Sequence, residues 1–347
     1  MKALILLGGL GTRLRPLTLE RPKPLLPILN RPFLAYQIDL LKKHGVRDVV
    51  LALGHQSAHF RDKLGDGSSW GVRFIYSVEK EPRGTGGAIR LARPHLGERA
   101  FILNGDIFSD FDLASLAAHH EKSRAEVTLA LVTVENPAAY GLVEIRADGT
   151  VTRFIEKPIG PSFPCRTVNA GCYLFEPGAV DAIPADRPVS IEREVFPGLL
   201  AAGRRVVGWR HGGYWSDIGT LSTYWSTHRD LLVAGKVGRG AQRRGGVWVD
   251  RGAVVSPRVE FRGRVLVGAG ARVAADVRFE GHVTIGANAR VGTGAHLSDC
   301  VVLEGARVGA RSVVARSIIG AGAVVEPRRR VGPAPESPDV PGLFGFS

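Results

Sequence analysis

The residues best suited to chemistry lie near the start of the chain, where an apolar run leads into a glycine-rich, basic segment. Residues 3–7 are all apolar, which predicts a strand buried on both faces of a parallel sheet. Three glycines follow within four positions, and glycine has no Cβ to prevent backbone N–H groups from turning toward an anion. Basic side chains come next, and these can pair with phosphate oxygens. The glycines are Gly8, Gly9 and Gly11, and the cations are Arg13, Arg15 and Lys23. The segment therefore predicts a phosphate-binding loop.

Two common phosphate motifs are excluded by the residues after Gly11. A Walker loop needs glycine followed by Lys-Ser or Lys-Thr, whereas Gly11 is followed by Thr12 and Arg13. The dinucleotide-binding fingerprint needs a third glycine three residues after Gly11, and that position is Leu14. The loop must therefore be of another type.

The whole string from Gly8 to Thr18, followed by Pro-Lys-Pro at residues 22–24, resembles the signature of the nucleotide-sugar pyrophosphorylases (sugar-1-phosphate nucleotidyltransferases). The resemblance covers about residues 1–325. It implies that the loop, including its glycines and Thr12, wraps a nucleoside triphosphate while Arg13 and Lys23 hold the phosphates. The implied reaction joins the triphosphate to a sugar 1-phosphate and releases pyrophosphate. Its nucleophile is an already anionic phosphate oxygen, so neither a general base nor a protein nucleophile is needed.

A second glycine cluster, residues 84–87, follows a predicted strand over residues 74–78 and opens a predicted helix. The resemblance implies that Gly84 and Thr85 lie against the nucleotide base, and that Glu79 reads the edge of that base. A carboxylate only accepts hydrogen bonds, and guanine offers two adjacent donors. Glu79 therefore favours guanine, with Glu81 as the nearby alternative for this role.

Asp106 ends the apolar strand predicted over residues 101–106, where a carboxylate could bind Mg²⁺ as a hard oxygen ligand. The nearby Asp110 and Asp112 are expected to be solvated acids or a helix cap. The resemblance implies that Asp106 holds the metal and that Asp217, in a Trp-Ser-Asp-Ile-Gly segment, is the second ligand. The expected cofactor is Mg²⁺.

Three further segments match family motifs that contact the sugar phosphate. The resemblance implies that the backbone of Gly141 approaches the sugar and that Glu156 binds its hydroxyl groups. It places Lys157 on the sugar phosphate, where it also acts in catalysis, and Asn169 on the sugar. A Ser-Ile-Glu-Arg-Glu segment at residues 190–194 is a weaker match.

The elements that must position these residues alternate between strands and helices. Apolar residues at helical spacing predict a helix over residues 33–44, ended by Gly45, and residues 49–53 predict another strand. The alternation predicts an α/β fold with helices on both faces of the sheet, whose ligands gather at the carboxyl ends of the strands. With the resemblance, residues 1–232 are expected to form a Rossmann-like nucleotidyltransferase domain with a mixed, mostly parallel sheet.

The remaining third of the chain has a different pattern. Residues 233–246 have the glycine-rich composition of a linker. From Val249 to Leu303 an apolar residue stands at every sixth position, and the phase slips by one near Val308. This period predicts a parallel β-helix of hexapeptides over residues 247–326, and it resembles the left-handed form with three hexapeptides per coil. Residues 327–347 form a Pro- and Gly-rich tail that is expected to be partly disordered.

Composition narrows the class of protein. The 347 residues carry a formal net charge of +13, but the basic residues are dispersed among acids, which argues against a nucleic-acid-binding protein and favours a field that attracts anionic substrates. No apolar run is long enough to span a membrane, and the N-terminal run is too short for a signal peptide. The three cysteines lack metal-binding spacing, so free thiols and a cytoplasmic location are expected. A homo-oligomer is the expected assembly.

The favoured substrates are GTP and mannose 1-phosphate, and several alternatives stay open. The base and sugar could instead be dTTP or ATP with glucose 1-phosphate, or GTP with a heptose phosphate. The repeat could carry a second, acyltransferase activity at His282 or His296. The chain could also be a non-catalytic regulatory relative, although the presence of Arg13, Lys23, Asp106, Lys157 and Asp217 argues against this.

Overall fold

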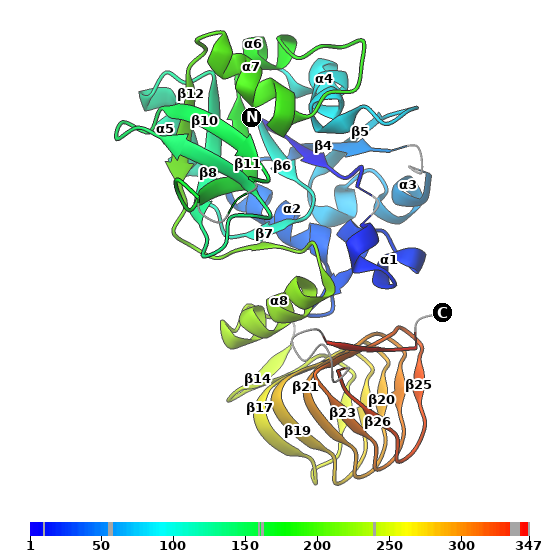
Figure 1. The fold of residues 1–347 in the computed structure, drawn as a ribbon. Coiled ribbons are helices and arrows are strands. Elements are labelled where there is room, and N and C mark those ends of the chain that lie inside the picture. The colour runs from blue at the N-terminus through cyan, green and yellow to red at the C-terminus, as the bar shows by residue number, and fades with distance from the viewer. Residues whose placement is uncertain are drawn as a thin grey trace. The chain divides into compact units, whose positions relative to one another are not determined.

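The computed structural model describes residues 1–9, 11–54, 58–158, 160, 163–238, 241–333 and 341–345. The chain divides into two compact units (Figure 1). The first unit contains Met1–Gly9 and Leu34–Ser216, and the second contains Leu10–Phe33 and Asp217–Ser347. In this division residues 10–33 and 217–232 group with the C-terminal part of the chain, whereas the domain predicted from sequence covers residues 1–232.

A mixed β-sheet forms the centre of the first unit. Its strands run in the order β10 (Val151–Glu156), β9 (Gly141–Ile145), β11 (Thr167–Phe175), β6 (Ala100–Asn104), β1 (Lys2–Leu6), β4 (Asp48–Leu53) and β5 (Arg73–Val78). β8 (Val127–Thr133) pairs with β11, and β12 (Val206–Arg210) pairs with β8. The strands β6, β1, β4 and β5 are parallel, whereas β11 runs antiparallel to β6 and β8. The predicted α/β fold with a mixed sheet is confirmed.

Apolar side chains of the strands and helices form one core in this unit. Leu4 of β1 and Ile102 of β6 are fully buried, as the apolar runs predicted, and they share a core with Ile89 of α4 (Gly84–Leu96). The other described helices are α2 (Phe33–Lys43), α3 (Ala58–Leu64), α5 (Leu113–Lys122), α6 (Pro177–Asp181) and α7 (Phe196–Ala201), with a 3-10 turn at Ser68–Trp70 and a π-helical turn at Ile191–Val195. Asp112 caps α5 by accepting from the N–H groups of Ala114 and Ser115, so it is the helix cap that the sequence suggested.

The second unit begins with short elements: η1 (Thr12–Leu14), α1 (Leu17–Glu20), η2 (Lys23–Leu25), and the two-stranded sheet of β2 (Pro27–Ile28) and β3 (Arg31–Pro32). It continues with α8 (Leu221–Val233), which a Thr220 capping box begins. At the end of the first unit, β13 (Trp215–Asp217) forms a two-stranded sheet with β7 (Ile107–Ser109).

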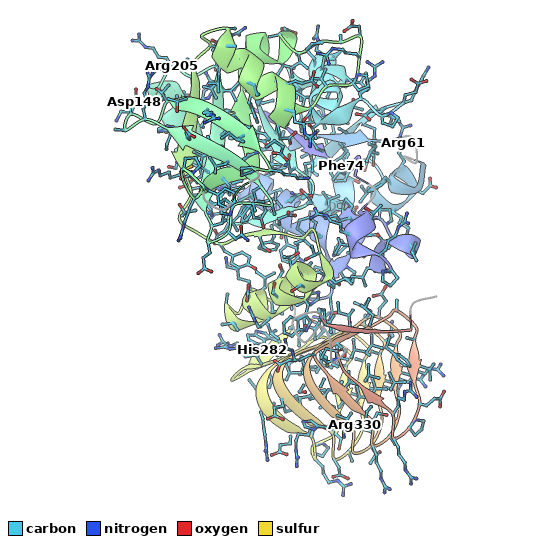
Figure 2. The ribbon with its side chains drawn as sticks, in the orientation of Figure 1. Arg61, Phe74, Asp148, Arg205, His282 and Arg330 are labelled. Carbon is cyan, nitrogen blue, oxygen red and sulfur yellow. The ribbon has the colours of Figure 1, made fainter. Side chains whose placement is uncertain are left out.

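Parallel strands stacked coil upon coil make up the rest of this unit, and we call residues 247–331 the repeat domain. One ladder contains β15 (Val247–Val249), β17 (Glu260–Val267), β19 (Arg278–Ile285), β21 (His296–Val302), β23 (Val313–Ala315) and β26 (Arg330–Val331). A second ladder contains β16 (Val254–Val255), β18 (Arg272–Val273), β20 (Arg290–Val291), β22 (Arg307–Val308) and β25 (Val324–Val325). Val247 pairs with Val265 and Glu260 with Arg278, so one coil takes three hexapeptides. Arg330 is exposed on β26 (Figure 2).

The interruption of the six-residue period lies one hexapeptide earlier than expected, before Val302 rather than near Val308. Ile285 pairs with Val302 rather than with Leu303, so the short step falls between Leu297 and Val302. Val302 is fully buried in the core of the repeat domain. The parallel, three-hexapeptide coil agrees with the sequence pattern, and its left-handedness stays a prediction. In the tail, β27 (Gly342–Phe344) pairs with β24 (Ser317–Ile319), while residues 334–340, 346 and 347 lie outside the described residues.

Candidate active site

The glycine-rich loop requires glycine at position 11. Gly11 has a φ of 60°, in the left-handed region that other residues rarely adopt. A Cβ at this position would lie 3.0 Å from Cγ2 of Thr18 and 3.4 Å from Cβ of Lys23. Thr18 also donates from its hydroxyl to the Gly11 carbonyl oxygen at 2.9 Å. The backbone of the loop is thus held against the base of the Lys23 side chain, which places one predicted phosphate ligand beside the loop.

Gly219 brings the Arg13 guanidinium and the Asp217 carboxylate together. A Cβ at Gly219 would lie 2.9 Å from Nη2 of Arg13, 3.0 Å from Oδ1 of Asp217 and 3.2 Å from Oδ2 of Asp217. Both charged groups therefore occupy the space where a side chain at residue 219 would begin. Arg13 is exposed and Asp217 is partly buried, so this cation and this carboxylate can both meet a ligand. Their sequence separation exceeds two hundred residues, and the second unit makes them neighbours.

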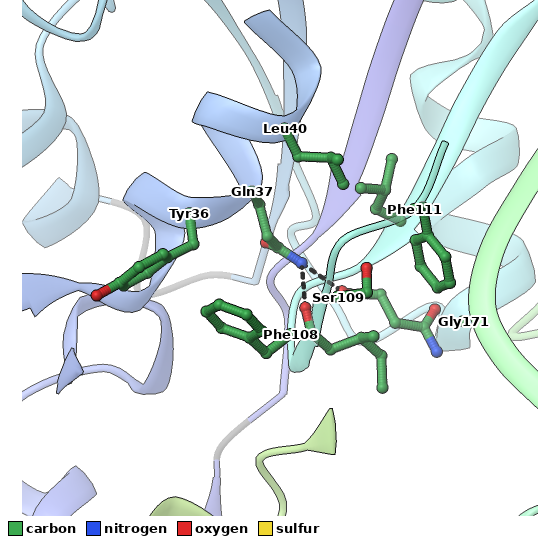
Figure 3. Close-up of a pocket in the computed structure, with 10 residues that line it drawn as sticks. Tyr36, Gln37, Leu40, Phe108, Ser109, Phe111 and Gly171 are labelled. Atoms are coloured by element: carbon green, nitrogen blue, oxygen red, sulfur yellow. Dashed lines mark hydrogen bonds between the residues drawn. The ribbon is translucent and has the colours of Figure 1, made fainter. Parts of the chain in front are cut away.

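A buried glutamine holds the turn that carries Asp106 (Figure 3). Gln37 of α2 donates from Nε2 to the carbonyl oxygens of Asn104 at 2.8 Å and Ile107 at 3.1 Å. These two carbonyls lie on either side of Asp106, which is partly buried at the end of β6. Gly105 adds a third support, since its N–H donates to the Leu6 carbonyl oxygen at 2.9 Å. The turn is therefore fixed from both sides.

Sequence analysis missed Gln37, although a signal was present. Phe33, Leu34, Ile38 and Leu41 mark the apolar face of the helix, and Gln37 lies on that same face. Only 4% of Gln37 is exposed. A buried amide needs hydrogen-bond partners, so a polar residue on an apolar helix face indicates a specific structural role.

The predicted base-reading residue Glu79 follows β5 directly and is buried. Its Oε2 accepts a hydrogen bond from the backbone N–H of Arg83 at 3.2 Å. Burial raises the pKa of the Glu79 carboxyl above its usual value, and the charge and N–H of Arg83 oppose this shift. The alternative reader, Glu81, is exposed. Of the two candidate carboxylates, Glu79 is therefore buried and Glu81 is exposed to solvent.

The start of α4 packs tightly on the segment that follows α6. Gly84 has a φ of 67°, and a Cβ there would lie 2.6 Å from the Val189 carbonyl oxygen. Thr85 accepts from the N–H of Ile191 at 2.9 Å and donates to Oε2 of Glu192 at 2.9 Å. Gly84 is required by this close backbone approach, and the Thr85 hydroxyl is committed to protein contacts.

Gly141 and Glu156, both predicted to contact the sugar, are paired across the neighbouring strands β9 and β10. A Cβ at Gly141 would lie 2.8 Å from Oε2 of Glu156 and 2.6 Å from Cζ of Phe154. Burial, and next the neighbouring negative charge of Glu192, raise the pKa of the Glu156 carboxyl, while Lys157 and Arg193 oppose the shift. Lys157 itself is exposed and has a φ of 48°.

Asn169 is oriented by its own strand. Its Nδ2 donates to the hydroxyl oxygen of Tyr173 at 2.7 Å, and its Oδ1 accepts from the N–H of Gly171 at 3.0 Å. Tyr173 is fully buried. The Asn169 amide is therefore held in one orientation.

Glu192 is a second residue that sequence analysis did not assign. It accepts from the hydroxyls of Thr85 and Ser190, each at 2.9 Å, and its charge acts on Glu156. Glu192 thereby connects the start of α4 with the Gly141–Glu156 pair. Its signal was the Ser-Ile-Glu-Arg-Glu segment, which the sequence alone did not connect with either group.

The predicted site residues fall into two sets. The first unit carries Gly8, Gly9, Glu79, Gly84, Thr85, Asp106, Gly141, Glu156, Lys157 and Asn169, and the second carries Gly11, Thr12, Arg13, Lys23 and Asp217. In the described part of the chain, no group of three or more His, Cys, Asp or Glu side chains could hold a metal ion. None of the described helices is long and apolar enough to cross a membrane.

Two known protein families match parts of this chain. Residues 2–233 match the family described as Nucleotidyl transferase, and residues 261–334 match the GMPPB C-terminal domain. Because the first match covers more than half of the chain, the chain belongs to the nucleotidyl transferase family. The resemblance drawn from the glycine-rich signature is confirmed, and the chain is a nucleotidyltransferase.

Two relatives of the chain are mannose-1-phosphate guanylyltransferases by name. The chain is 43% identical to the mannose-1-phosphate guanylyltransferase of Mycobacterium tuberculosis over 259 residues, which cover 74% of this chain and 71% of the relative. It is 38% identical to the probable mannose-1-phosphate guanylyltransferase 1 of Oryza sativa subsp. japonica over 333 residues, which cover 92% and 86% of the two chains.

Solved structures share the fold. A putative glucose-1-phosphate thymidylyltransferase from Bacillus anthracis aligns with a TM-score of 0.62 at 24% identity, covering 69% of this chain and 97% of the other. HddC from Yersinia pseudotuberculosis, complexed with GMP-PN, aligns with a TM-score of 0.57 at 25% identity, covering 66% and 99%. The first likeness supports the fold alone.

Proposed function

We propose that this nucleotidyltransferase is a mannose-1-phosphate guanylyltransferase, which converts GTP and mannose 1-phosphate to GDP-mannose and pyrophosphate. The observation that carries the reaction is the meeting of Arg13 and Asp217 at Gly219, in the unit that also holds Gly11 and Lys23. The relatives named above, one of them matched along 92% of this chain, support the choice of substrates.

The chemistry needs charge neutralisation and alignment rather than proton transfer. A phosphate oxygen of the sugar phosphate attacks the α-phosphorus in line, and the bond to the β-phosphate oxygen breaks so that pyrophosphate leaves. Arg13 and Lys23 are assigned to the triphosphate and Lys157 to the sugar phosphate. Their positive charges stabilise the charge that develops on the transferred group, and positioning of the two anions supplies the remainder.

Asp106 and Asp217 are assigned as the Mg²⁺ ligands. Both are partly buried carboxylates, and Mg²⁺ in phosphoryl-transfer sites is usually bound by one or two carboxylates together with phosphate oxygens and water. A protein cluster of three or more ligands is therefore not required. When bound, the ion would add positive charge at the phosphates.

Glu79 is assigned to the base. A buried carboxylate rejects a base that offers it no donors, because the charge would be left unpaired. Guanine offers N1–H and its amino group side by side, whereas adenine offers an acceptor at N1. Gly141, Glu156 and Asn169 are assigned to the sugar. Two alternatives stay open: dTTP or ATP with glucose 1-phosphate, and GTP with a heptose phosphate. The pyrophosphate-release assay described below distinguishes them from GTP with mannose 1-phosphate.

The alternative of a second, acyltransferase activity in the repeat domain stays open. His282 of β19 (Figure 2) lies with Nδ1 3.2 Å from Oδ1 of Asp299, and His296 lies with Nε2 3.0 Å from Oε2 of Glu280. Both histidines are thus engaged in ion-pair geometry between neighbouring coils. The homo-oligomeric assembly, the cytoplasmic location and the left-handed β-helix stay predictions.

Pyrophosphate release tests the proposal. The full chain is assayed with GTP, ATP, dTTP and UTP, each against mannose, glucose and a heptose 1-phosphate, with Mg²⁺ present. We expect the highest kcat/KM for GTP with mannose 1-phosphate. A preference for dTTP or ATP would contradict the assignment of Glu79 to guanine. Absence of turnover with every pair of substrates would contradict the proposed function.

A further inference from the structure

The segment that carries the phosphate-binding residues is fastened to the repeat domain. Residues 10–33 belong to the second unit, and Arg13 and Lys23 lie within them. Asn30, farther along the same segment, donates from Nδ2 to the Ile285 carbonyl oxygen of β19 at 2.9 Å. Arg21 forms an ion pair with Glu304, which lies 283 residues away in the chain. Two side chains of the segment thus reach neighbouring coils.

Helix α8 also contacts the same segment, through the side chains of Tyr224 and His228. Tyr224 donates from its hydroxyl to the Pro27 carbonyl oxygen at 2.6 Å, and Nε2 of His228 lies 3.1 Å from that oxygen. Nδ1 of His228 lies 3.5 Å from the N–H nitrogen of Leu29. Burial lowers the pKa of His228 to about 4, so its ring is neutral and can donate to Pro27 while accepting from Leu29. The backbone at residues 27–29 is therefore held by α8.

The same helix is itself bound to the repeat strands. Trp225 donates from Nε1 to the Asp299 carbonyl oxygen of β21 at 2.9 Å, and His228 also lies 3.5 Å from Oγ1 of Thr284 on β19. Helix, segment and strands thus form one hydrogen-bonded assembly in the second unit. The residues of this segment that are assigned to phosphate lie between Gly11 and Lys23.

We infer that the repeat domain positions the segment that binds the triphosphate. Glu304 is the positioning residue that we single out, because it pairs with Arg21 of that segment. This inference rests on the proposed function and extends it. A glycine-rich loop loses much conformational freedom when it closes on an anion, so a loop that is already ordered binds at lower entropic cost. Arg21 lies two residues before Lys23, and fixing Arg21 therefore restricts where Lys23 can be. The repeat domain then contributes to nucleotide affinity without touching the nucleotide.

The magnitude of the Arg21–Glu304 contribution is limited by solvent. The two side chains are 34% and 33% exposed, and pairs of this exposure contribute little to overall stability. We therefore expect an effect on KM of about fivefold when the pair becomes a repulsive one. This is small enough to leave folding intact and large enough to measure.

Charge reversal in the full chain tests the inference. Glu304→Arg should raise the KM for GTP and the Kd for a non-hydrolysable GTP analogue about fivefold, with kcat and the KM for mannose 1-phosphate unchanged. The double variant Arg21→Glu with Glu304→Arg should return both values to within about twofold of the parent, because the pair is restored in reverse. Arg21→Glu alone completes the cycle.

Glu280→Arg is the matched control, because Glu280 also lies on the repeat domain and its Oε2 lies 3.0 Å from Nε2 of His296. Both reversals make the protein more positive, and a general field would lower the KM for GTP in both variants. A rise confined to Glu304→Arg therefore has the opposite sign from the field effect.

Two results would overturn the inference: an unchanged KM and Kd in Glu304→Arg, or a double variant that recovers neither. Binding of the GTP analogue reports on the loop even where turnover is absent, so failure of the positioning role is distinguishable from failure of the proposed function. Thermal unfolding of each variant shows whether a change in KM is accompanied by loss of folded protein.

Discussion

The substitution Gly219→Ala tests most directly whether Arg13 and Asp217 act together. The added Cβ would lie 2.9 Å from Nη2 of Arg13, and an ordinary contact begins near 3.4 Å, so the guanidinium must move by about 0.5 Å. The Asp217 carboxylate, at 3.0 Å, must move by a similar amount. Misplacement by about 1 Å can cost on the order of 10²-fold in rate, so half of that predicts a loss of about tenfold in kcat/KM.

The predicted loss should leave stability almost unchanged. Gly219 does not have a left-handed φ, and the atoms that would be crowded are the ends of flexible side chains, which can rotate away. Gly198→Ala is the matched control, because a Cβ at Gly198 in α7 would meet nothing within 4 Å. The assay is pyrophosphate release under titration of GTP, with thermal unfolding alongside. Equal kcat/KM in Gly219→Ala and the parent would refute the proposal that these two charges act at one place.

Further predictions concern the metal, the base and a buried histidine. Asp106→Asn or Asp217→Asn should lower kcat at least ~10²-fold with Mg²⁺ present. Full activity in either variant would contradict the assignment of that aspartate as a Mg²⁺ ligand. Glu79→Gln should lower kcat/KM for GTP and raise it for dTTP or UTP. Because burial raises the pKa of Glu79, the parent should lose preference for GTP as pH falls, at a higher pH than an ordinary carboxyl would titrate. His228 has its pKa lowered from 6.5 to about 4, so the unfolded chain takes up this proton first on acidification. Its contribution to the free energy of unfolding is complete above pH 6.5 and declines by roughly 3 kcal/mol as pH falls toward 4. Denaturant titrations of the parent and of His228→Gln between these pH values measure that slope, and equal slopes would contradict the assignment.

Much of the local structure follows from the sequence alone. The apolar run before Gly8 forms β1, and the helical spacing from Phe33 forms α2. The six-residue period is reproduced as stacked coils, because each coil must place its apolar residues above those of the coil before it. The glycine-rich signature was enough to identify the family.

Site residues whose role depends on distant partners were less accessible to sequence analysis. Gln37 acts through carbonyl oxygens more than sixty residues away, and Glu192 acts through Thr85 and Glu156. The exact place where the repeat loses one residue was also misjudged, since Val302 and Leu303 are both apolar and only the register distinguishes them. In each case the missing information was a pairing between segments.

The sequence by itself determined the family, several strands and helices of the first unit, the repeat and the residue types available for binding phosphate, because these depend on local periodicity and on motifs of adjacent residues. Only the tertiary structure decided that residues 10–33 join the C-terminal unit, that Arg13 meets Asp217 at Gly219, and that Arg21 pairs with Glu304. Such contacts depend on which surfaces the folded chain buries against each other. The spacing of residues along the chain does not predict which residues hundreds of positions away will be in contact.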